Sequence, residues 1–210
     1  MKKYFIVFTA ILMTLTMAAR LPETQAAKKE CVSPDALKLK EDMRTLWNDH
    51  VIWTHNYIVS AVDGLEDQEK VLERLLQNQK DIGNAIKPFY GEKAGNQLAE
   101  LLTEHIVIAG KIVESAKAGN QAEVEKLNKE WYRNADDITA FLIGANPNWS
   151  EKELKELLYM HLDFVTKEAV ARIQKDWNQN IESFDKGRAH IFHLADALSK
   201  GITKQFPQKF

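Results

Sequence analysis

The chain has 210 residues, of which 45% are hydrophobic and 28% charged, a length and composition that suit one domain with its own core. The formal net charge is −2 and charges of both signs are interspersed, so no basic stretch indicates nucleic-acid binding. Cys31 is the only cysteine, which excludes a disulfide within the chain.

The first 26 residues have the layout of a secretory signal peptide. Two lysines precede a 15-residue apolar run at 5–19, and Thr24 and Ala26 supply small residues before a cleavage site. The run is short for a membrane span, so we expect cleavage near Ala26 and a secreted or extracytoplasmic protein. The mature chain then begins with a flexible segment at 27–33 and has 25 basic and 29 acidic residues, a net charge of −4. No later segment is apolar enough to cross a membrane.

Helix signals dominate the rest of the chain, and strand patterns are absent from the sequence. Ser33 and Pro34 are typical of a helix start, and Ser150 with Glu153 has the spacing of a capping box. These signals predict six helices, at roughly 34–62, 66–87, 93–117, 121–143, 151–177 and 180–202. We therefore expect an all-α bundle, in the style of ferritin or hemerythrin, that forms a single domain over 34–210.

Three stretches of the sequence align as an internal repeat: LWNDHVIWTHNYIVSA at 46–61, LLTEHIVIAGKIVESA at 101–116 and LLYMHLDFVTKEAVAR at 157–172. The alignment places His50, His105 and His161 in register, 55 and 56 residues apart. Each histidine lies in the middle of the apolar face of its helix, where a polar side chain is unusual. The repeat predicts that the six helices form three pseudo-repeated antiparallel hairpins.

The intervening helices repeat a second pattern, in which Asn or His is followed by Asp three residues later on the same helix face. The pairs are Asn78 and Asp81, Asn134 and Asp137, and His193 and Asp196. In each hairpin the repeated histidine of the first helix and the Asn or His of the second helix lie equally far from the turn, about 21–24 Å at 1.5 Å per residue. The two side chains should therefore meet at one height. The sequence thus predicts a central His/Asp layer, with Glu168 at its edge.

Two interpretations of this layer stay open. The first is a site for Fe, Mn or Zn, with metal ligands His50, His105, His161, His193, Asp81, Asp137 and Asp196 and with Asn78, Asn134 and Glu168 orienting them. A metal ion would also offset the cost of burying aspartates. The Glu-x-x-His motif of ferritin-like di-iron proteins is missing, however. The second interpretation is a purely structural layer that fixes the register of the helices.

The two interpretations predict different functions. Under the first, the chain is an exported protein that binds a metal ion or small ligand. An enzyme of this kind would carry out metal-assisted oxidation or hydrolysis, with an aspartate or Glu168 as proton acceptor. Under the second, the chain is a non-catalytic envelope or interaction protein with an unidentified cell-envelope partner. Whether the protein is an enzyme, and its oligomeric state, stay open.

Five phrases of the sequence carry a resemblance to known proteins: LWNDH, NQKDIGNAIKPFYG, EHIVIA, WYRNADDI and the closing QFPQKF. Together they resemble a group of small helical, often exported proteins of Bacillus-like bacteria, over roughly Ser33 to Phe210. The resemblance implies a bacterial setting and the extent of the domain. It implies no activity.

Overall fold

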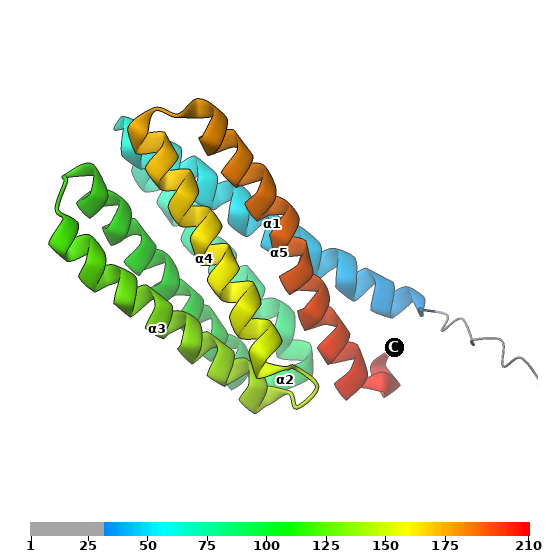
Figure 1. Cartoon of the computed structure of the whole chain (residues 1–210). Coiled ribbons are helices and arrows are strands. Elements are labelled where there is room, and N and C mark those ends of the chain that lie inside the picture. Colours follow the sequence, from blue (N-terminus) through cyan, green and yellow to red (C-terminus); the bar gives the residue numbers. More distant parts are fainter. Residues whose placement is uncertain (1–31) are drawn as a thin grey trace, which may run out of the picture. The chain divides into compact units, whose positions relative to one another are not determined.

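The computed structural model describes residues 32–210, which form five α-helices and one short 3-10 helix with no strand among them (Figure 1). The elements are α1 (Pro34–Asp63), α2 (Gln68–Lys117), α3 (Gln121–Ala145), α4 (Glu151–Gln174), α5 (Trp177–Gln205) and η1 (Pro207–Lys209). The predicted all-α class is confirmed. The predicted signal peptide at 1–26, Cys31 and most of the segment at 27–33 lie outside the described residues.

Polar side chains fix where α1 and α4 begin. The Ser33 hydroxyl accepts a hydrogen bond from the Ala36 backbone N–H at 3.1 Å, and Pro34 occupies the first helical turn. Ser150 accepts from the Glu153 backbone N–H at 3.3 Å. Each bond satisfies a backbone donor that a helix leaves free at its start, so both predicted helix starts are confirmed.

The predicted count of six helices is wrong, because the segments expected at 66–87 and 93–117 form one element, α2. Within α2 only Gly91 has a non-helical backbone, with φ 83° and ψ 171°, a conformation essentially limited to glycine. The chain doubles back there, since a Cβ added to Gly83 would lie 2.4 Å from the Gly95 carbonyl oxygen and 2.8 Å from the Ala99 Cβ. The turn needs no separate loop, and the two arms of α2 pack closely.

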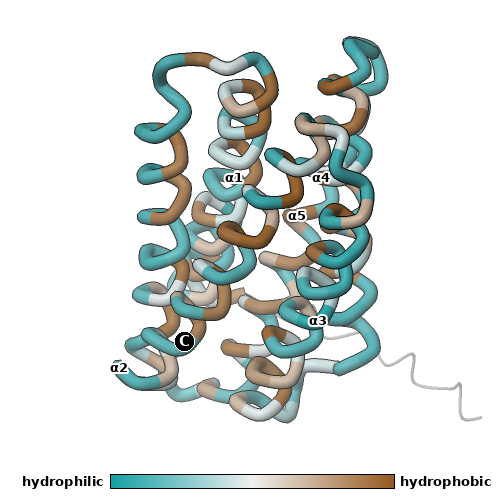
Figure 2. Tube along the Cα trace, turned by 90° about the vertical axis from the view of Figure 1, so that its left-hand side faces the viewer, coloured by the Kyte–Doolittle hydropathy of each residue, from teal (hydrophilic) through white to brown (hydrophobic). Residues whose placement is uncertain are grey.

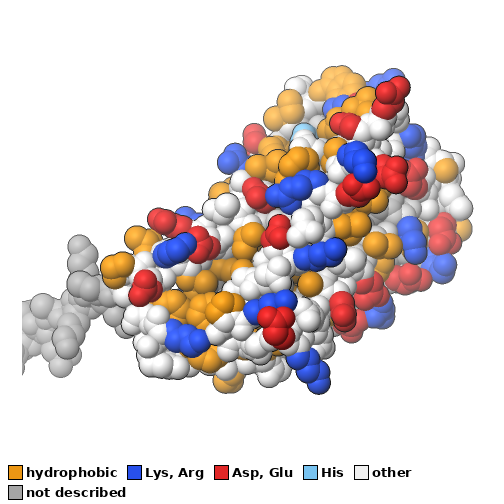
Figure 3. Space-filling view, turned by 180° about the vertical axis from the view of Figure 1, so that it is seen from behind, with side chains coloured by type: hydrophobic (Ala, Val, Ile, Leu, Met, Phe, Trp, Pro, Cys, Tyr) orange, Lys and Arg blue, Asp and Glu red, His pale blue; other side chains and the backbone are white. Residues whose placement is uncertain are grey.

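The helices pack side by side around two clusters of buried hydrophobic residues (Figures 1 and 2). α1 packs against α2 and α5, α2 packs against α3, and α4 packs against α5. On the face drawn in Figure 3, charges of both signs are interspersed with hydrophobic and uncharged side chains. Within residues 32–210, no helix combines the length and apolar character that a membrane crossing requires.

Candidate functional site: a buried histidine cluster

Three of the predicted residues meet in the core and form what we call the histidine cluster: His50 from α1, His105 from the second arm of α2 and His161 from α4. The three side chains belong to residues that are only 2–3% exposed. The ring centroid of His161 lies 5.4 Å from that of His50 and 6.3 Å from that of His105. Residues 55 and 56 positions apart in the sequence therefore converge at one level of the bundle.

An amide side chain fixes the orientation of the His50 ring. The His50 Nδ1 lies 3.2 Å from Gln79 Oε1. The amide nitrogen of Gln79 donates to the Leu75 carbonyl oxygen at 2.7 Å and to Asn78 Oδ1 at 3.2 Å, so the oxygen of Gln79 must face the ring. An amide oxygen can only accept, and Nδ1 of His50 therefore carries the hydrogen. In the neutral ring this leaves Nε2 with a free lone pair.

His105 has the same arrangement with Asn134. The Nδ1 of His105 lies 2.8 Å from Asn134 Oδ1, and Asn134 Nδ2 donates to the Leu101 carbonyl oxygen at 3.1 Å and to Glu104 Oε2 at 3.2 Å. Asn134 thus orients a histidine as the sequence predicted. Gln79 was missed, because the repeat aligns it with Ala135 and so gives it no polar counterpart.

The third histidine and two tryptophans leave buried polar atoms without partners. Within residues 32–210, His161 Nδ1 and the indole nitrogens of Trp47 and Trp131 have no hydrogen-bond partner. The Trp47 ring packs against His50 with centroids 5.5 Å apart, and Trp131 packs against His105 at 5.1 Å. An unsatisfied buried polar group costs about 1–3 kcal/mol. Three of them around one cluster indicate a place where a further group can bind.

All three rings of the cluster are neutral at pH 7. Burial, together with repulsion from His105, lowers the pKa of His50 to about 3. Burial also lowers the pKa of His105 to about 4. Burial, followed by repulsion from the two other rings, holds the pKa of His161 well below its usual range. Neutral imidazole is the form that binds metal ions.

The predicted aspartates do not join the cluster, and this part of the His/Asp layer is wrong. Their side chains are 30–46% exposed and pair with arginines at the surface: Asp81 with Arg74, Asp137 with Arg133 and Asp196 with Arg44. A residue three positions along a helix is rotated about 60° from its partner, which is enough to turn it from the core to the rim. Exposure to water also avoids the cost of three buried charges.

The third copy of the Asn/Asp pattern is shifted by three residues. His193 is exposed, whereas His190 is buried and donates from Nε2 to the Leu157 carbonyl oxygen at 2.8 Å. His193, a predicted metal ligand, lies outside the cluster. The buried position that the sequence assigned to His193 is occupied by His190.

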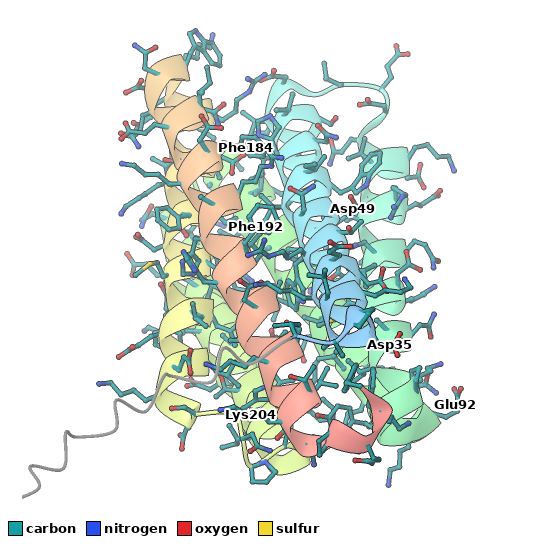
Figure 4. The ribbon with its side chains drawn as sticks, turned by 90° about the vertical axis from the view of Figure 1, so that its right-hand side faces the viewer. Asp35, Asp49, Glu92, Phe184, Phe192 and Lys204 are labelled. Atoms are coloured by element: carbon teal, nitrogen blue, oxygen red, sulfur yellow. The ribbon has the colours of Figure 1, made fainter. Side chains whose placement is uncertain are left out.

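Glu168 also lies away from the cluster. Its carboxylate pairs with His55 Nδ1 at 2.6 Å, and burial raises the pKa of Glu168 despite this bond. The His55 ring packs on Phe184 with centroids 4.4 Å apart, on the side of α5 that faces α1 (Figure 4). The predicted position at the edge of the layer is therefore wrong, because seven residues along α4 carry Glu168 about 10 Å from His161.

The fold and the site define a helical bundle with a neutral, buried histidine cluster at its centre. In the part of the chain that the structure describes, no three His, Cys, Asp or Glu side chains are placed to hold one metal ion. Comparison of the chain with family models, curated proteins and solved structures found no match.

Proposed function

We propose that this chain is an exported binding protein that takes up a transition metal ion at the histidine cluster. The observation that carries the proposal is the fixed orientation and tautomer of the His50 and His105 rings. Amide oxygens hold His50 and His105 in the Nδ1–H form, which leaves both Nε2 lone pairs free. Metal-binding histidines in proteins are oriented in the same way, by a hydrogen bond from the second ring nitrogen.

The donor set narrows the choice of metal. Without the aspartates the cluster offers imidazole nitrogens, which suit Zn or Fe better than Mn, an ion that prefers carboxylate ligands. Binding requires a rotation of the His161 ring, because the side chains as they lie do not form a ligand set. This rotation breaks no hydrogen bond at His161 Nδ1, because that atom has no partner.

A non-catalytic envelope or interaction protein is the second candidate, and a specific set of contacts favours it. Asn78, Asn134 and His190 each donate to a backbone carbonyl oxygen of another helix, 32 or 33 residues back in the sequence, at 2.8–3.1 Å. Such bonds fix the height of one helix against the next. The recurrence of this bond at nearly the same sequence separation also supports the proposed repeat of three helical hairpins. On this view the histidine cluster only sets the register of the bundle.

The substitution His161→Leu distinguishes the two candidates. We expect the wild-type protein, purified without chelator, to bind Zn²⁺ in isothermal titration and to melt at a higher temperature with Zn²⁺ present. His161→Leu should fold, because leucine has a similar size and removes an unpartnered nitrogen. It should lose Zn²⁺ binding, whereas the matched control His193→Ala, at an exposed histidine, should keep it.

The metal proposal fails if wild-type protein binds neither Zn²⁺ nor Fe²⁺ and its melting temperature is the same with and without these ions. Equal Zn²⁺ affinity of the wild type and His161→Leu would also contradict it. Either result leaves the register-fixing layer as the function of the cluster.

Export forms part of the same proposal. It is supported by the signal-peptide pattern at 1–26. Mass spectrometry of protein expressed in a Bacillus host should find the mature chain in the medium or cell-wall fraction, with its N-terminus near Ala27. An uncleaved chain in the cytosol would contradict this part.

A further inference from the structure

A second candidate site is the seam cavity, an apolar space of about 340 Å³ between α3 and α4, floored by α1 and α2. α3 and α4 come together near the turn that joins them and diverge toward their other ends (Figure 1). Most of the lining is aliphatic or aromatic, and it includes Ile58, Leu75, Ile106, Val113, Val165 and Ile173.

The seam cavity lies one helical turn from the histidine cluster. Thr54, Ala109 and Val165 line it, and each follows a histidine of the cluster by four residues. Ala109, Ala116 and Ala169 are the small side chains of the lining. The cavity is open to water where exposed residues of α3 and α4 line it, and an apolar occupant would remove its aliphatic walls from water.

The volume sets the size of the occupant. An apolar cavity of about 150 Å³ stays dry and takes up one benzene molecule, so a cavity of about 340 Å³ takes an apolar body roughly twice as large. A two-ring aromatic or a chain of about ten carbons has this size. The volume also lies at the low end of the range for ligand pockets, roughly 300–1,000 Å³, which favours a small molecule over a peptide.

The polar residues of the lining set the charge of the occupant. Glu125 is the only charged side chain in the lining. Gln121, Asn128 and Thr166 are neutral and polar and, like Glu125, lie on α3 or α4, where the lining is exposed or partly exposed. Thr54 and Tyr57 add hydroxyl groups from buried positions on α1. No lysine or arginine lines the cavity, so a carboxylate or phosphate would find no cation to pair with.

We infer that the seam cavity binds a small molecule with an apolar body and a neutral or cationic polar end. The apolar body fills the space between α3 and α4, and the polar end lies beside Glu125. This inference concerns a site separate from the metal site, and its test is run with EDTA present. The two proposals can therefore fail independently.

The test uses the mature protein and a neutral fluorescent probe, N-phenyl-1-naphthylamine. Fluorescence should rise on binding, and 1-decanol and decylamine should displace the probe. Decanoate should compete at least about tenfold more weakly than decylamine, because its charge meets Glu125. Glu125→Gln should weaken decylamine about two- to fivefold, the scale of an exposed ion pair, and leave 1-decanol unchanged.

Two variants close the cavity from inside. Ala109→Phe and Ala169→Phe should each reduce probe binding at least about tenfold, since each ring occupies the space of the ligand. Ala140→Phe is the matched control, because Ala140 is exposed on α3 and does not line the cavity. Thermal melting shows whether each variant is folded. Glu125→Gln alters an exposed residue, so its comparison remains informative even if a filling variant does not fold.

Three results would overturn the inference. The first is folded wild-type protein that takes up no probe. The second is a folded filling variant that binds the probe as tightly as Ala140→Phe does. The third is decanoate that competes as well as decylamine, which would contradict the charge of the occupant.

Discussion

Acid should destabilise this protein already between pH 6.5 and pH 5, because the histidine cluster is held neutral. An unfolded histidine has a pKa of about 6.5, whereas the folded values are about 3 for His50 and about 4 for His105. The pKa of His161 is also well below its usual range. Below pH 6.5 the unfolded chain therefore binds protons that the folded chain excludes. The stability that the neutral rings contribute is complete above pH 6.5 and is lost as the pH falls toward 4.

The expected size of the effect follows from these pKa values. One pKa unit corresponds to about 1.4 kcal/mol, so His50 and His105 each cost about 2 kcal/mol of unfolding free energy at pH 5. Together they cost about 4 kcal/mol, and His161 adds to this loss, against a total stability of about 5–15 kcal/mol for a typical domain. The protein should thus lose a large part of its stability by pH 5.

Urea denaturation at pH 7.5, 6.0 and 5.0 measures this loss, and His161→Leu isolates one ring. The variant should lose less unfolding free energy than the wild type between pH 7.5 and pH 5, because it has one fewer histidine to protonate on unfolding. Contributions from all other groups cancel in this difference. Parallel pH curves for the two proteins would refute a neutral, buried His161.

Two further predictions concern packing and hydrogen bonds. A Cβ on Gly201 would lie 1.9 Å from the Trp149 indole nitrogen, so Gly201→Ala should lower the free energy of unfolding in urea by about 1–3 kcal/mol. Gly144 has open space around it, so Gly144→Ala should raise this free energy by about 0.5–1 kcal/mol. Asn134→Ala should cost about 1–3 kcal/mol, because it leaves a buried ring N–H unpaired, and Asp137→Ala should cost less than about 1 kcal/mol at the surface. Equal losses for the last two variants would contradict the assignment of the amide, and not the carboxylate, to the core.

Much of the fold could be predicted because its signals are local. Helix faces follow from a period of 3.6 residues, and the starts of α1 and α4 follow from Ser33 and Ser150. The number of helices could not be predicted in this way. Pro88 and Gly91 indicate a break, but whether a break needs a loop depends on how closely the arms pack. Here Gly83 and Gly95 allow backbone contact, so one residue is enough for the reversal.

The histidine cluster could be predicted for the same reason, since three apolar faces each carry one imidazole. The hydrogen-bond partners of the histidine rings were harder to predict. The neighbour of a predicted residue in the sequence can reach the ring in place of the predicted residue. Gln79 does this beside Asn78. One local signal pointed to the surface position of an aspartate: Arg133 precedes Asp137 by four residues, which is the spacing of a helical ion pair.

The misplaced third copy of the repeat explains why the aspartates were assigned to the core. Asp196 follows His193 by three residues, and this spacing matched the two Asn/Asp pairs. The contact that recurs in the structure is instead a bond to a backbone carbonyl oxygen 32 or 33 residues back, and His190 makes it in the third copy. An aspartate has no role in that bond, because a carboxylate cannot donate to a carbonyl oxygen. Neutral side chains that can donate, those of Asn and His here, form this bond. Burying them costs far less free energy than burying three carboxylates.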